Sequence, residues 1–249
     1  RLAAAGRDEL AAGLKQDGFA VVETDVKERE ILELALANFD AARSFRFPPV
    51  PEDGKKTVER AATMPPAFQQ CFELLYSVAV SAAYALTGPK GPFPPLPACS
   101  GGSWPFEGEG GPWPYDQSFF NIFNYDRGCL NTHRDRGVLT VVYGGAGRRD
   151  EVENATLSRE AAAPSRLWLH LPEPEGDGRR WIAPAAGHLL IWAGEGLATM
   201  AEELGGVEAI EHCVRVDPTG PYVEHSHSTP DPAAPACGNR RSVAFVLDS

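Results

Sequence analysis

The stretch Asn131-Thr-His133-Arg-Asp135-Arg-Gly-Val-Leu-Thr140 decides how the fold of this chain is interpreted. It places an imidazole and a carboxylate two residues apart, directly before the β-branched run at 138–143. In a strand, residues i and i+2 project from the same face, so we expect His133 and Asp135 to reach one point together. That point is predicted to be a metal ion. Because an isolated H-x-D pair arises often by chance, the prediction depends on the later segments of the chain.

Two later segments supply the groups that complete such a site. Residues 210–216 are predicted to form a strand carrying His212, and residues 239–247 a final strand with Arg240 and Ser242 on one face. Two histidines and one carboxylate, with coordination positions left open, form the facial triad of non-haem Fe(II) oxygenases.

The order H-x-D, then H, then R-x-S resembles the iron(II)/2-oxoglutarate-dependent dioxygenases, in the isopenicillin N synthase-like branch. The resemblance runs from Leu10 to Leu247 and is specific at the triad, the R-x-S and the stretch Gly194-Glu-Gly-Leu197. It implies an enzyme that oxidises, by hydroxylation in the default case, a small organic substrate while 2-oxoglutarate is decarboxylated to succinate. The implied ligands of Fe(II) are His133, Asp135 and His212.

The resemblance also implies how the cosubstrates bind. The guanidinium of Arg240 would hold the far carboxylate of 2-oxoglutarate, with Ser242 adding a hydroxyl, because a planar fork suits a carboxylate. Tyr125, in an Asn-Tyr pair before the H-x-D, would contact 2-oxoglutarate; a buried core tyrosine is the alternative. O2 would take the last open position, and ascorbate is the expected reductant.

Several alternatives stay open at this stage. The family usually has H-R-V at the distal histidine, and here the sequence is H-C-V, with 240 − 212 = 28 positions to the arginine. His225 or His227 could therefore replace His212 as ligand. An isopenicillin N synthase-like oxidase that needs no 2-oxoglutarate, a zinc-dependent hydrolase and a non-catalytic cupin-like binding protein are the competing functions. Cys213, His225, His227 and Cys237 also form a chemically adequate set for a second, structural zinc.

Composition narrows the class of protein. The chain has 249 residues with 43% hydrophobic residues, enough for one large domain with a substantial core. The formal net charge of −11 disfavours nucleic acids and anionic membranes as partners, and no apolar run reaches the ~18 residues of a membrane span. Five widely spaced cysteines without a C-x-x-C predict reduced thiols and a cytoplasmic protein. We expect a monomer; because the chain opens on Arg1, an upstream targeting segment stays an open alternative.

The pattern of elements predicts a mainly β fold with flanking helices. Helices are expected at 7–17, 27–43 and 66–86, a short strand at 19–22, and about eight short strands from 117 onward. This is a double-stranded β-helix, a cupin-like jelly roll preceded by N-terminal helices. We expect one domain over 1–249, with a helical region and Pro/Gly-rich loop at 1–115 and a catalytic core at 116–249.

Two segments outside the strands and two further histidines complete the expectations. The Pro/Gly-rich loop at 88–115 carries aromatic residues that would line or cover a substrate pocket. Residues 144–165 are polar and form an insertion or lid that accounts for the 212 − 135 = 77 positions between two of the triad residues. His170 and His188 lie in expected strands away from the motif positions, so both are predicted to be structural.

Overall fold

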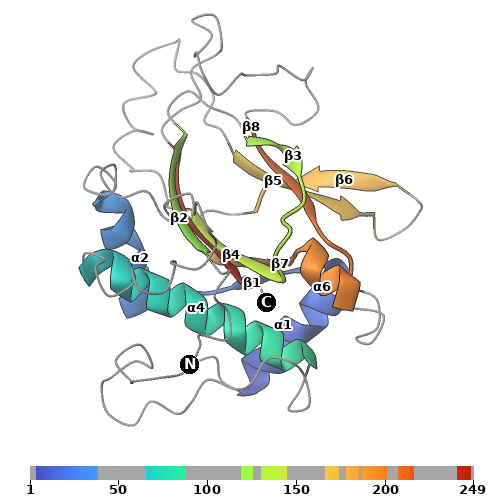
Figure 1. The fold of residues 1–249 in the computed structure, drawn as a ribbon, viewed down its shortest axis with the longest axis horizontal. Helices are drawn as coiled ribbons and strands as arrows, with labels where there is room; N and C mark the ends of the chain where they lie inside the picture. The colour runs from blue at the N-terminus through green and yellow to red at the C-terminus, as the bar shows by residue number, and fades with distance from the viewer. Residues whose placement is uncertain are drawn as a thin grey trace, which may run out of the picture.

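The structure is a computed structural model that describes residues 4–38, 66–87, 119–125, 130–144, 166–173, 178–184, 187–200, 207–215 and 240–247. Within these ranges the strands form two antiparallel sheets (Figure 1). The major sheet has the strand order β1-β7-β4-β9-β2 and the minor sheet the order β3-β8-β5-β6. The strands are β1 (Phe19–Val22), β2 (Phe119–Tyr125), β3 (Leu130–His133), β4 (Leu139–Gly144), β5 (Arg166–Pro172), β6 (Arg179–Ile182), β7 (Leu189–Ala193), β8 (Glu211–Arg215) and β9 (Arg240–Leu247). The predicted mainly β architecture with flanking helices is confirmed.

The space between the two sheets is filled by alternate residues of their strands. Val142, Leu190 and Ala244 of the major sheet pack with Leu169 and Val214 of the minor sheet in one buried cluster. Because neighbouring residues of a strand point to opposite faces, the residues between these contribute to the other side of each sheet. The buried cluster between the two sheets is therefore a hydrophobic core.

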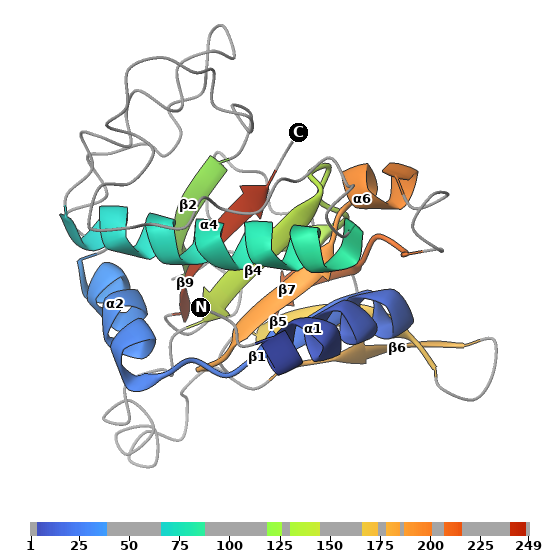
Figure 2. The ribbon, with the colours of Figure 1, turned by 90° about the horizontal axis from the view of Figure 1, so that it is seen from below.

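Among the described residues, three helices cover the outer face of the major sheet: α1 (Ala4–Asp17), α2 (Val26–Ala37) and α4 (Pro66–Thr87). Figure 2 shows α4 crossing the strands of this sheet. Its Phe72 ring meets the ring of Phe245 on β9 edge to face, with centroids 5.4 Å apart. The predicted apolar stripe of α4 is buried, as are Leu10 and Leu14 of α1. Aromatic and aliphatic packing thus fixes the helices on the sheet.

The ends of α2 follow from local hydrogen bonds. Asp25 and Glu28 form a capping box, in which each side chain accepts from the other residue's backbone N–H, at 2.8 and 2.9 Å. The helix ends at Ala37, earlier than the predicted residue 43, because Asn38 turns its side-chain amide onto the carbonyl of Leu34 at 2.8 Å. An asparagine that bonds the last turn in this way stops the helix.

One polar contact ties α2 to the sheet beneath it. The fully buried Tyr143 of β4 donates its hydroxyl proton to Glu33 of α2, at 2.6 Å. Burial, followed by the hydrogen bond and charge of Glu33, raises the pKa of Tyr143 above its usual range.

Within the described ranges, none of the helices combines the length and apolar character needed to cross a bilayer.

Candidate metal centre

The three predicted ligands meet at one edge of the minor sheet. His133 is the last residue of β3, and it lies directly opposite His212 of β8 in the antiparallel register. Asp135 follows His133 by two residues, and the ligand atoms of all three side chains lie within 4.8 Å of one another. Among the residues that the structure describes, this is the group of His, Cys, Asp and Glu side chains suited to a metal ion.

One detail of the prediction was wrong. We expected His133 and Asp135 to converge by strand alternation, but β3 ends at His133 and Asp135 lies in the turn before β4. Their convergence therefore depends on the turn, and the neighbouring helix α6 (Glu195–Met200) holds that turn in place.

The brace from α6 consists of backbone hydrogen bonds. The N–H of Glu195 donates to the carbonyl of Asp135 at 2.8 Å, and the N–H of Gly196 to the carbonyls of Arg136 and Gly137, both at 3.1 Å. The N–H of Gly194 donates to the carbonyl of Val138 at 3.0 Å. The Gly-Glu-Gly-Leu motif thus has a structural role. Its backbone N–H groups lie at the start of α6, where they have no partner within the helix, and they bond the loop that carries the carboxylate ligand.

The distances within the triad suit a single ion. His133 Nε2 lies 3.4 Å from Asp135 Oδ1, and His212 Nε2 lies 3.6 Å from Asp135 Oδ2. Two ligands on adjacent corners of a coordination shell with bonds of about 2.1 Å are about 3 Å apart, so a small contraction is enough to bind. The His212 side chain is 4% exposed and that of His133 is 36% exposed, so solvent reaches the site from the His133 side.

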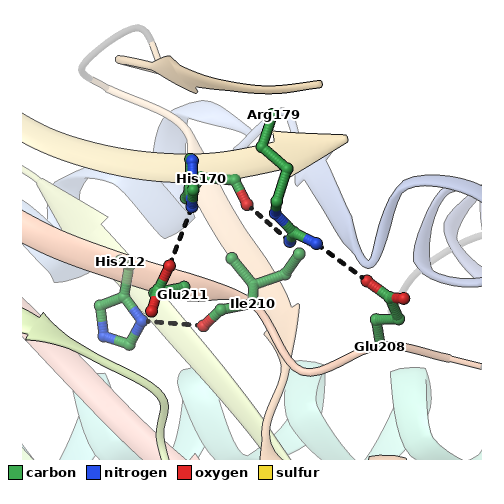
Figure 3. Close-up of polar contacts among 6 residues, drawn as sticks. All are labelled: His170, Arg179, Glu208, Ile210, Glu211 and His212. Atoms are coloured by element: carbon green, nitrogen blue, oxygen red, sulfur yellow. Dashed lines mark hydrogen bonds and ion pairs between the residues drawn. The ribbon is translucent and has the colours of Figure 1, made fainter. Parts of the chain in front are cut away.

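The ring of His212 is held in the form that a metal requires. Its Nδ1 lies 3.2 Å from the carbonyl oxygen of Ile210, so Nδ1 carries the proton and Nε2 keeps its lone pair (Figure 3). Burial lowers the pKa of His212, an effect that outweighs the opposing charge of Asp135. The imidazole is therefore neutral and ready to ligate.

The carboxylate is ionised. Burial alone would raise the pKa of Asp135, but the hydrogen bond with His133, the attraction that a protonated His212 would exert and the hydrogen bond from Thr140 together lower it to about 2. Besides Thr140, the indole N–H of Trp192 also donates to this carboxylate, at 3.0 Å. Thr140 and Trp192 were not predicted as site residues, because nothing in their local sequence pattern marks a contact that forms across strands.

The predicted cosubstrate residues come together on β2 and β9. Ser242 of β9 is 4% exposed, and Arg240 begins the same strand two residues earlier. The Cα partner of Arg240 is Tyr125, the last residue of β2. The register thus brings the three positions to one end of the β2–β9 pair, while the side chains of Arg240 and Tyr125 lie outside the described part of the chain.

His170 lies away from the triad, on the outer face of the minor sheet. Its Nδ1 lies 2.8 Å from Glu211 Oε2, and its ring stacks on Trp181 with centroids 4.5 Å apart. Arg179 donates to the carbonyl of His170 and forms an ion pair with Glu208 (Figure 3). This arrangement is that of a structural histidine, as predicted.

The remaining predictions mostly concern residues outside the described ranges. His188 is half-buried and is not part of the triad group. Cys213 is fully buried and is the Cα partner of Trp168, on the opposite side of β8 from His212. The other three members of the possible zinc set, His225, His227 and Cys237, lie outside the described residues, as do the aromatic loop at 88–115 and the insertion after Gly144.

No family model and no curated protein matches the chain. Solved structures do. A putative oxygenase from Shewanella oneidensis is 14% identical, with a TM-score of 0.56, over 99% of this chain and 87% of that one. The 2-oxoglutarate complex of dioxygenase for auxin oxidation 1 from Arabidopsis thaliana is 12% identical, with a TM-score of 0.54, over 98% and 87%.

A third similar structure is a full-length protein of Neurospora crassa in complex with 2-oxoglutarate and 5-formyluracil. It is 11% identical, with a TM-score of 0.50, over 98% of this chain and 78% of that one. At these identities the likeness is one of fold, and it agrees with the two antiparallel sheets and the helices on the major sheet. The chain therefore has the double-stranded β-helix fold that its motifs predicted.

Proposed function

We propose that the chain is an Fe(II)- and 2-oxoglutarate-dependent dioxygenase that oxidises a small organic substrate, with hydroxylation as the default outcome. The observation that carries the proposal is the convergence of His133, Asp135 and His212 on one point. Two histidines and one carboxylate are the donor set of the non-haem Fe(II) oxygenases. The 2-oxoglutarate bound to the fold relative from Arabidopsis supports the choice of cosubstrate.

The residues of the site fit an iron ion. His212 offers Nε2 because its Nδ1 is committed to Ile210, and Asp135 offers an ionised carboxylate. Three protein ligands leave about three positions of an octahedral ion free for other groups. When bound, the iron supplies the O2 chemistry that is coupled to oxidative decarboxylation of 2-oxoglutarate to succinate and carbon dioxide.

The cosubstrate is proposed to bind along β9. Arg240 would receive the far carboxylate, because a guanidinium offers two parallel donors to the two carboxylate oxygens. Ser242 would add a hydroxyl, and its burial keeps that hydroxyl away from bulk water. Tyr125, the Cα partner of Arg240, would contribute its phenol to the same cosubstrate.

A small organic molecule is the proposed primary substrate. The Neurospora fold relative binds 5-formyluracil alongside 2-oxoglutarate, which supports this class of substrate. Solvent reaches the triad from the His133 side, so a small molecule could approach the metal there. Ascorbate is the proposed reductant for iron.

Binding of 2-oxoglutarate tests the proposal without knowledge of the primary substrate. The full chain is stripped of metal, reloaded with Mn(II), and titrated with 2-oxoglutarate by calorimetry, with Asp135→Ala as the metal-free control. We expect saturable binding that requires the metal, together with succinate release when Fe(II), ascorbate and O2 replace Mn(II). Metal binding without 2-oxoglutarate binding would favour the isopenicillin N synthase-like oxidase, and Zn(II)-dependent hydrolysis of ester or amide probes would favour a hydrolase.

A further inference from the structure

Two buried donors converge on one oxygen of the carboxylate ligand. Thr140 Oγ1 donates to Asp135 Oδ2 at 2.5 Å, and Trp192 Nε1 donates to the same oxygen at 3.0 Å. Thr140 lies on β4 and Trp192 on β7, and the two are Cα partners in the major sheet. Both residues are 2% exposed, so water does not compete for these bonds.

These two hydrogen bonds limit which oxygen of Asp135 can bind a metal, because each carboxylate oxygen has only two lone pairs. A carboxylate has about four acceptor sites, two on each oxygen. The donors from Thr140 and Trp192 occupy both sites of Oδ2, although this oxygen lies 3.6 Å from His212 Nε2. Asp135 Oδ1, which faces His133 Nε2 at 3.4 Å, is then the oxygen available to a metal.

We propose that Thr140 and Trp192 are positioning residues that make Asp135 a one-oxygen metal ligand and so preserve three open coordination positions. The inference rests on the proposed metal site and goes beyond it. If both oxygens of Asp135 bound the ion, the protein would fill four positions of an octahedral shell. Two would remain, too few for a two-oxygen cosubstrate and O2 together.

Trp192 contacts a second metal ligand, His212, besides Asp135. Its ring lies 4.7 Å, centroid to centroid, from the ring of His212, tilted by 51°. The same side chain therefore fixes the carboxylate by its N–H and limits rotation of the imidazole by its ring. Thr140 touches the site through its hydroxyl, which makes it the cleaner position to test.

The test uses Co(II) as the probe and the full chain in three variants. Thr140→Val removes the hydroxyl at nearly constant shape, Thr140→Ser keeps a hydroxyl, and Trp192→Phe removes the indole donor. We expect Thr140→Val and Trp192→Phe each to weaken Co(II) binding by about 10- to 100-fold, as for other partners of metal ligands, with Thr140→Ser close to the parent. The visible Co(II) spectrum should also change in Thr140→Val, because a second carboxylate oxygen can then join the coordination shell.

The outcomes separate this inference from the proposed function. A parent chain that does not bind Co(II) at the triad would overturn the metal site itself. A parent that binds, with Thr140→Val and Trp192→Phe equal to it in affinity and spectrum, would overturn the positioning role. Equal weakening in Thr140→Val and Thr140→Ser would also overturn it, because the hydroxyl would not be the cause. The melting temperature of each metal-free variant reports whether the variant is folded. If Thr140→Val does not fold, the comparison of Trp192→Phe with the parent still tests the positioning role.

Discussion

A substitution at Gly194 should disrupt the backbone hydrogen bonds that hold the loop carrying Asp135. A Cβ at this position would lie 2.0 Å from the carbonyl oxygen of Gly137 and 2.9 Å from that of Asp135. Ordinary contact begins at 3.4 Å, so the Gly194→Ala variant needs a retreat of about 1.4 Å (3.4 − 2.0) by one backbone from the other. Both atoms are backbone, so rotamer changes cannot relieve the clash.

The expected loss has two contributions. Overpacking of this kind costs about 1–3 kcal/mol. Separating the two backbones also stretches the bonds from the N–H groups of residues 194–196, each contributing about 1 kcal/mol. We therefore expect Gly194→Ala to lower the free energy of unfolding by about 3 kcal/mol. The affinity for Mn(II) should fall at least about tenfold, because the displaced loop carries Asp135.

Urea denaturation and Mn(II) titration measure these two effects, and Gly187→Ala is the matched control. Gly187 precedes β7, the strand that Gly194 follows. Its φ is 87°, and a Cβ added there would have no atom within 4 Å. Alanine there meets only the strain of a left-handed backbone, about 1–2 kcal/mol, and should leave Mn(II) affinity unchanged. Parental stability and metal affinity in Gly194→Ala, or equal loss of affinity in both variants, would refute the idea that this glycine braces the ligand loop.

Three further predictions concern Tyr143 and Arg240. Tyr143→Phe removes the hydrogen bond to Glu33 and should lower the free energy of unfolding by about 1.5–3 kcal/mol in urea denaturation, with unchanged metal affinity. Because folding raises the pKa of Tyr143, the parent should lose stability as the pH rises above about 10, the pKa of an unfolded tyrosine. The Tyr143→Phe variant should not show this part of the loss. An equal loss of stability in both proteins would contradict the prediction. Arg240→Lys should weaken 2-oxoglutarate binding at least about tenfold in calorimetry, since an ammonium cannot make two parallel bonds; unchanged affinity would remove Arg240 from the site.

The sequence was sufficient for the fold class and for naming His133, Asp135 and His212 as candidate ligands that lie together. The H-x-D pair, the later His212 and the alternating strands predicted a metal site in a jelly roll, and the structure brings the three ligands together. These features are local patterns or an order of motifs. Helix ends were less predictable, because Asn38 ends α2 through one side-chain bond that competes with continued helix.

The supports of the site could not be predicted from the chain alone. The contact of Thr140 and Trp192 with one oxygen depends on the register of β4 with β7, strands that are far apart in the sequence. The brace from Gly194 depends on backbone N–H groups, which every residue but proline carries, so no residue type marks it. Close approach of two backbones is what the glycine made possible, and that appears only in three dimensions.

The central claim is that His133, Asp135 and His212 hold an iron ion that binds 2-oxoglutarate. Its most direct test is an anaerobic titration of the metal-free chain with Fe(II) in the presence of 2-oxoglutarate, monitored by visible charge-transfer absorption. We expect a band that saturates at one Fe(II) per chain and is absent in His212→Ala. A parent chain without such a band, or a His212→Ala variant that retains it at the same Fe(II) concentration, would contradict the claim.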